Sequence, residues 1–236
     1  MTSRERVLAA INHREPDRLP IDVGGTEVTG LHGIAYNRLK SHLGMNGGPT
    51  RLFHVYMQLA RVEDEMRRHF AGDVIRLSFE ATQWKPGVLS DGSPCEVPAD
   101  WNPVRLEDGS DVLMGMDGKP MLQRHADSPW FSPAGPICPF IQTAEDVGKY
   151  TPVLRMMDRS AWLDEDLAAL AARAKRIRET TDCAIAGVFG GHIFAAAQLI
   201  RGMENFMCDL VAGESLATAL LETLAELHVE EFKHYI

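Results

Sequence analysis

The hydrophobic and polar positions follow two patterns along the chain. Apolar residues at helical spacing, with charged residues between them, predict amphipathic helices at 52–70, 163–177 and 216–227. Short, continuously apolar runs predict strands at 19–23, 73–79 and 183–189. Helices that alternate with buried strands are typical of a mostly parallel α/β protein. We therefore expect an α/β fold of the (β/α)8 TIM-barrel type.

Two further patterns mark helix starts. Thr2-Ser-Arg-Glu5 and Thr143-Ala-Glu-Asp146 both fit a capping box, in which a hydroxyl and a carboxylate satisfy the first backbone N–H groups of a helix. Each pattern predicts a short helix directly after it.

Residues 84–135 differ from the rest of the chain. Asp-Gly pairs at 91–92, 108–109 and 117–118 separate short apolar segments. Such pairs favour the tight turns of β-hairpins. We expect an antiparallel β-hairpin insertion here rather than further α/β layers.

The expected barrel is incomplete in this chain. A closed (β/α)8 barrel needs eight strands, and about three convincing ones can be found. The sequence also ends within a helical pattern, at 228–236, without a Gly or Pro. We expect residues 1–236 to be the N-terminal portion of one barrel domain. The alternative is a natural helical C-terminus, which needs no stop signal.

Charge and composition restrict the partners of the protein. The net charge of -9 argues against nucleic acid or an anionic membrane as the main partner. The longest apolar stretch, Val188–Ile200, contains His192 and Gln198 and is too short to span a bilayer. No apolar leader follows the N-terminal charges, and the four cysteines are widely spaced. We expect a cytoplasmic protein with reduced thiols.

Three segments carry a resemblance to a known family. They are SRERVLAAINHREPDRLPID at 3–22, GDVIRLSF at 72–79 and GVFGGHIFAAAQLIRG at 187–202. Together they resemble the uroporphyrinogen decarboxylase superfamily, and more closely its corrinoid methyltransferase-like branch. The chain is similar to the N-terminal half to two-thirds of a family member. The resemblance implies a (β/α)8 barrel with an active-site cleft at the carboxyl ends of the strands.

The resemblance also implies an activity. Family members decarboxylate the acetate side chains of a tetrapyrrole, or move methyl groups among small methylated compounds, corrinoids and thiols or pterins. The decarboxylases carry two arginines in an early loop, where this sequence has IDVGGTEVTGLHG at 21–33 and so lacks an arginine fork for carboxylates. A methyltransferase-like enzyme is therefore implied. The alternatives are a uroporphyrinogen decarboxylase of tetrapyrrole biosynthesis, and an inactive fragment or subunit that needs a partner chain to complete the barrel.

Cofactors and partners follow from the same resemblance. A small methylated compound would be the substrate, and a corrinoid (cobalamin) on a corrinoid protein would be the co-substrate. Thiol-methylating relatives bind zinc through His-x-Cys and a distant Cys, and no His stands two residues before a Cys here. We therefore expect zinc only with residues beyond this chain. A partner chain or a homo-oligomer would complete the assembly.

The first candidate site residues follow the first predicted strand. Asp22 would face the cleft as a catalytic proton acceptor, or else would cap the turn at Gly24 and Gly25. These two glycines would let a substrate approach the backbone closely. His32, in the same loop, would bind substrate and assist acid–base chemistry, or else would be an exposed loop residue.

The remaining candidates belong to the second and third predicted strands. Arg76 would bind a substrate carboxylate or form a surface salt bridge, and it would face away from Asp73, three residues earlier. Gly190 and Gly191 would hold an anionic substrate group or form a tight turn. His192, at the start of the next helix, is the second catalytic candidate, with a hydrogen-bonded core histidine as the alternative.

Overall fold

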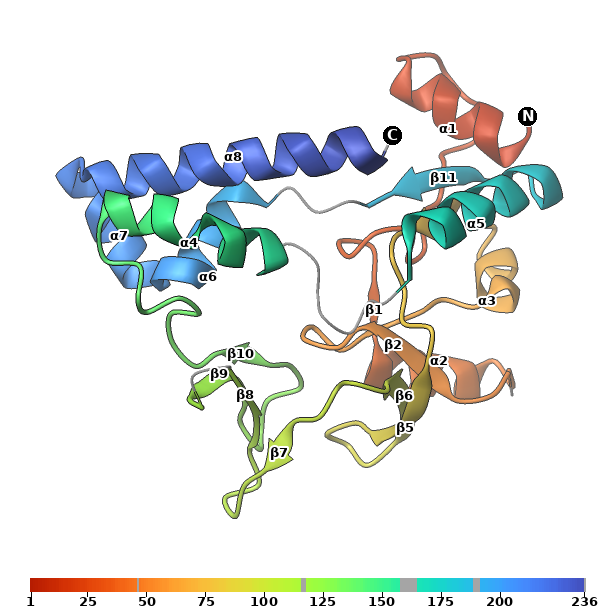
Figure 1. Ribbon diagram of the computed structural model, residues 1–236. Helices are drawn as coiled ribbons and strands as arrows, with labels where there is room; N and C mark the ends of the chain where they lie inside the picture. The colour runs from red at the N-terminus through yellow and green to blue at the C-terminus, as the bar shows by residue number, and fades with distance from the viewer. Residues whose placement is uncertain (46, 116–117, 158–164, 189–191, 236) are drawn as a thin grey trace. The chain divides into compact units, whose positions relative to one another are not determined.

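The structure of the chain, a computed structural model, describes residues 1–45, 47–115, 118–157, 165–188 and 192–235. The chain divides into two compact units (Figure 1). The first comprises Met1–Trp101 and Trp162–Val188, and the second comprises Asn102–Ala161 and Phe189–Ile236. Each unit has strands and helices of its own.

The helices of the first unit, within its described residues, are α1 Ser3–Ile11, α2 Gly33–His42, α3 Asp64–His69 and α5 Leu167–Thr180. The capping box predicted before α1 is present. The Thr2 hydroxyl accepts the Glu5 N–H, and the Glu5 carboxylate accepts the Thr2 N–H. The predicted short N-terminal helix is therefore confirmed.

The strands of the first unit form two sheets. One sheet has the order β1-β3-β2-β6-β5, with β1 Leu31–His32, β3 Leu59–Ala60, β2 Thr50–His54, β6 Pro94–Pro98 and β5 Trp84–Val88. The other is the parallel pair of β4 Val74–Leu77 and β11 Ala184–Gly187. The helices α1 and α5 lie beside β11 (Figure 1). The strands predicted at 73–79 and 183–189 are therefore confirmed over their central residues.

The second unit combines an antiparallel sheet with helices. The sheet has the order β10-β9-β8-β7, with β7 Val104–Arg105, β8 Asp111–Met114, β9 Pro120–Arg124 and β10 Ser132–Pro133. The helices are α4 Ala144–Met157, α6 Ile193–Arg201, α7 Met203–Ala212 and α8 Ser215–Tyr235. The helix start predicted at Thr143 is confirmed, because its hydroxyl accepts the Asp146 N–H and the Asp146 carboxylate accepts the Thr143 N–H.

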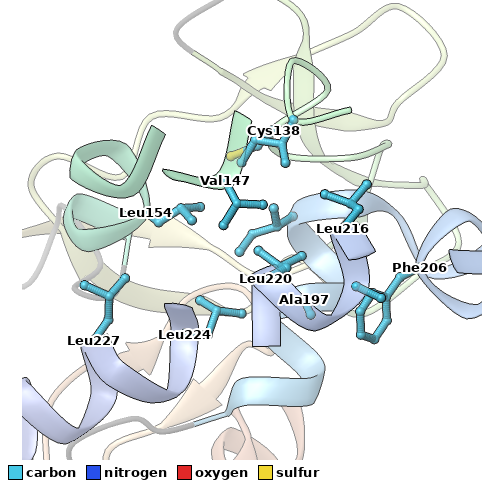
Figure 2. Packing of buried hydrophobic residues seen from close by; sticks show 12 residues of the cluster. Cys138, Val147, Leu154, Ala197, Phe206, Leu216, Leu220, Leu224 and Leu227 are labelled. Carbon is cyan, nitrogen blue, oxygen red and sulfur yellow. The ribbon is translucent and has the colours of Figure 1, made fainter. Parts of the chain in front are cut away.

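Figure 2 shows the hydrophobic core of these helices, which is built on one face of α8. The leucines of the predicted stripe are at most 6% exposed, which confirms their helical face: Leu216, Leu220, Leu224 and Leu227. The other helices contribute Val147, Leu154, Ala197 and Phe206 to the same cluster. Across the described residues, no helix combines the length and the apolar character that crossing a membrane requires.

The prediction of a (β/α)8 barrel is wrong. The described residues form separate sheets of five, four and two strands, none of them closed, and their parallel pairs are β2 with β6 and β4 with β11. The strand predicted at 19–23 is also absent. Pro20 has no N–H to donate, and the Ile21 N–H donates to the Asp73 carboxylate at 2.9 Å instead of to a neighbouring strand.

The helix predicted at 52–70 is largely wrong as well. Residues 50–54 form β2, residues 59–60 form β3, and only 64–69 are helical, as α3. Gln58 has φ 56°, a left-handed conformation that a continuous helix does not allow. The helical spacing of apolar residues therefore reflects burial from several elements and not one helix face.

The region predicted as a hairpin insertion, 84–135, contains antiparallel pairs: β5 with β6, and β7 to β10 in series. Gly92 and Gly109, at two of the Asp-Gly turns, have φ of +82° and +80°, which glycine adopts without steric cost. The boundary between the two units falls inside this region, after Trp101.

Candidate functional site

Asp73, at the amino end of β4, is the centre of a buried charge cluster. Its carboxylate is fully buried and accepts hydrogen bonds from Arg6 at 2.6 Å and from Arg18 at 2.8 Å. The Ile21 N–H donates to the same group. Burial alone would raise the pKa of the Asp73 carboxyl, but these hydrogen bonds hold the pKa below its ordinary value. Asp73 is therefore an ionised structural anchor.

This cluster joins segments that are far apart in the sequence. Arg6 also donates to Asp17, and that hydrogen bond is the largest cause of the lowered pKa of the Asp17 carboxyl. Arg4 donates to the backbone oxygens of Thr181 and Cys183, just before β11. The arginines of segment 3–22 thus fasten it to β4 and to the residues that lead into β11.

Asp22 organises the loop that follows. Its carboxylate accepts the Gly25 N–H at 2.7 Å and the Thr29 hydroxyl at 2.9 Å. Gly24 has φ +75°, and a Cβ at Gly25 would lie 2.4 Å from an Asp22 oxygen and 2.7 Å from Val74. Asp22, Gly24 and Gly25 therefore shape the loop at 22–30, and both Asp22 oxygens are engaged within it.

The loop at 22–30 places Glu27 beside Arg76, which lies near the carboxyl end of β4. Arg76 Nη2 donates to Glu27 Oε1 at 2.6 Å, and the two side chains are 17% and 24% exposed. The guanidinium carbon lies 4.1 Å from the centre of the Phe53 ring, a cation–π contact. Arg76 Nε is buried and has no hydrogen-bond acceptor among the described residues.

His54, at the end of β2, influences the same pair. Burial would raise the pKa of the Glu27 carboxyl, but Arg76 and the charge of His54 lower it overall. His54 Nδ1 accepts the Met57 N–H at 3.1 Å, so a neutral ring carries its proton on Nε2. The Tyr56 ring centre is 5.6 Å away, and burial raises the pKa of the Tyr56 hydroxyl. Glu27, Phe53, His54 and Arg76 are called the Arg76 cluster below.

A second set of ion pairs fixes the chain beyond β4. Arg173 of α5 donates to Glu165 at 2.6 Å and to Glu80 at 3.2 Å, and it also donates to the Ser78 backbone oxygen. Arg61 lies 3.2 Å from Glu80. The buried Arg173 side chain thus joins α5 to Ser78 and Glu80, just beyond the carboxyl end of β4.

The other predicted site residues are placed elsewhere. His32 precedes α2, and its Nδ1 accepts the Ile34 N–H at 3.2 Å, so it caps that helix. His192 lies in the second unit, at the residue before α6, where its side chain makes no capping hydrogen bond. Gly190 and Gly191 lie outside the described residues.

Sequence reasoning identified Arg76 but missed its three neighbours. Phe53 and His54 fell within the wrongly predicted helix, which hid their position at a strand end. Glu27 was a single acidic residue in a glycine- and threonine-rich loop. Its position could have indicated it, because Glu27 is the one acidic residue between Gly24 and Gly30. Asp22 was expected to cap the start of this same loop.

The described residues include no group of three or more His, Cys, Asp or Glu side chains arranged to hold a metal ion. The chemistry that the Arg76 cluster offers is anion binding by a guanidinium and hydrogen-bond donation by an imidazole N–H. No protein-family model, curated protein or solved structure matches this chain.

Proposed function

We propose that this chain supplies the substrate-binding part of an enzyme that moves a methyl group between a small methylated compound and a corrinoid, thiol or pterin acceptor. The Arg76 cluster carries the proposal, because it places a cation and a proton-carrying imidazole together near the end of a parallel strand. Its strand is one of the segments that resemble the uroporphyrinogen decarboxylase superfamily.

Methyl transfer can use both groups. The acceptor attacks the methyl carbon, the bond to the donor heteroatom breaks, and its electron pair stays on the leaving group, which then takes a proton. A corrinoid, when bound, supplies the nucleophilic cobalt. Arg76 fixes the polar end of the substrate, and His54 Nε2–H donates a hydrogen bond to the departing atom, which takes its proton from water.

The buried charges support this assignment because they hold the cluster in place. Arg18 and Asp73 join the loop start at 18–22 to β4, and Arg173 joins the other end of β4 to α5. A site whose parts come from separated segments needs such fixed supports for its geometry. Both supports are made within the first unit.

The test mixes the protein with cob(I)alamin and a panel of methylated oxygen, nitrogen and sulfur compounds. Formation of methylcobalamin changes the visible spectrum. We expect one donor class to give that change, and His54→Ala to slow it by about 100-fold, the usual contribution of a positioned hydrogen-bond donor. His42→Ala, which changes an exposed histidine at the end of α2, is the matched control and leaves the rate unchanged.

Two results would count against the proposal. One is an unchanged spectrum with every donor. The other is the release of carbon dioxide from the acetate side chains of uroporphyrinogen by the same protein, which would favour decarboxylation. Equal rates for His54→Ala and His42→Ala would remove the assigned role of His54.

A further inference from the structure

We propose that Glu27 occupies the place of a substrate carboxylate, and that a carboxylate-bearing substrate displaces it from Arg76. This inference rests on the proposed function, since it names the substrate class of the same site. It is based on the hydrogen-bonding groups of Arg76, of which Glu27 accepts from only one.

Arg76 has two neighbouring N–H groups on one side of its guanidinium, Nε and Nη2, and only Nη2 has a hydrogen-bond acceptor among the described residues. Nε and Nη2 of an arginine lie side by side at a spacing that matches the two oxygens of a carboxylate. Glu27 uses Nη2 alone, at 2.6 Å, whereas Nε is buried without an acceptor among the described residues. A buried N–H without an acceptor costs free energy. A ligand that accepts from both Nε and Nη2 removes this cost, which the single hydrogen bond to Glu27 does not.

Phe53 keeps this edge in place when Glu27 leaves. Its ring is 8% exposed and lies 4.1 Å from the guanidinium carbon, so it holds the plane of Arg76 independently of Glu27. The arginine therefore stays oriented for the incoming ligand.

The loop at 22–30 permits the exchange without unfolding. The Gly25 N–H and the Thr29 hydroxyl donate to Asp22, and the Gly24 N–H donates to the Thr29 oxygen; none of these three hydrogen bonds involves the Glu27 side chain. Val28, the next residue, is 95% exposed, so the loop tip borders solvent. Rotation of the Glu27 side chain alone opens the edge of Arg76.

The first experiment follows the arginine Nε–H signals of the whole chain by NMR during titration with acetate. Acetamide, of the same shape and without charge, is the control ligand. We expect acetate and not acetamide to move one signal, which is assigned to Arg76 by its loss in Arg76→Lys. In Glu27→Gln we expect acetate to bind about tenfold more tightly, because the competing charge is gone. Glu96→Gln, which removes the carboxylate of the Arg51–Glu96 pair at 2.7 Å, leaves the affinity unchanged.

A second set of measurements defines the ligand class. Arg76→Lys keeps a positive charge but loses the paired nitrogens, so acetate binding weakens at least tenfold there, as followed by the backbone amide signals of Glu27 and Phe53. Inorganic phosphate, titrated in the same way, binds more weakly than acetate. Tighter binding of phosphate, or an acetate affinity that Glu27→Gln does not raise, overturns the inference.

The two proposals fail separately. Acetate binding at Arg76 in a protein that methylates no acceptor from any donor overturns the proposed function and leaves the carboxylate site standing. Methyl transfer from a donor without a carboxylate, in a protein whose Arg76 signal does not respond to acetate, overturns the inference and leaves the activity.

Discussion

Two arginine–carboxylate sites lie three residues apart on the same stretch of chain, and they differ in how fully their charges are paired. Asp73 is 0% exposed and accepts from two arginines and a backbone N–H. Arg76 meets one oxygen of Glu27 and leaves Nε without an acceptor within the described residues. Complete pairing indicates a charge that holds the fold, and incomplete pairing indicates a charge that can hold a ligand.

The largest effect should come from breaking the complete pair. Asp73→Asn removes the charge that compensates Arg6 and Arg18, and Arg6 is itself 7% exposed. Removal of one partner from a buried pair leaves an uncompensated charge, so we expect a loss of about 3 kcal/mol in the free energy of unfolding. Urea denaturation followed by circular dichroism measures it, and a loss below about 1 kcal/mol would contradict the structural role of Asp73.

Acid should weaken the same site. The pKa values of Asp73 and Asp17 are lowered in the folded chain, so each carboxylate stabilises the fold above its unfolded pKa of about 3.9. That stabilisation is lost as the pH falls through the folded pKa. We expect the urea midpoint of the wild type to fall more steeply than that of Asp73→Asn below about pH 4. Parallel profiles for the two proteins would contradict the assignment to Asp73.

A smaller loss of stability should follow from Gly25→Ala, which adds a methyl group inside the loop at 22–30 that carries Glu27. The added methyl group of Gly25→Ala would lie 2.4 Å from an Asp22 oxygen and 2.7 Å from Val74, so the loop at 22–30 must shift. We expect a loss of about 1–3 kcal/mol in the free energy of unfolding, with weaker acetate binding at Arg76. Gly135→Ala, where a Cβ meets nothing within 4 Å, is the control. Equal stability of the two variants would show that the loop is not constrained at Gly25.

The features that the sequence predicted correctly depend on residues that are close together along the chain. The capping interactions of Thr2 with Glu5, and of Thr143 with Asp146, span three residues and were predicted correctly. Local spacing also predicted the buried face of α8. Such features depend on neighbours along the chain, so their partners are visible in the sequence.

The partners of Asp73 and Arg76 are remote. Arg6 is 67 residues from Asp73, and Glu27 is 49 residues from Arg76. Strand spacing correctly separated Asp73 from Arg76, but it could not say which charge each would meet. The same limit produced the wrong helix at 52–70, because apolar residues of a strand, a turn and a short helix are buried at a spacing that imitates one helix.

The smallest effect on stability should come from Glu27→Gln, and it gives the sharpest form of the comparison. The amide oxygen of glutamine can still accept from Arg76 Nη2, and Phe53 still packs on the guanidinium. The pair is partly exposed to solvent, so losing its charge should change the free energy of unfolding by less than about 1 kcal/mol. Urea denaturation beside Asp73→Asn checks this under identical conditions. A loss as large as that of Asp73→Asn would mean that Glu27, like Asp73, is a charge that stabilises the fold. The contrast between the fully paired Asp73 and a ligand-binding Arg76 would then no longer hold.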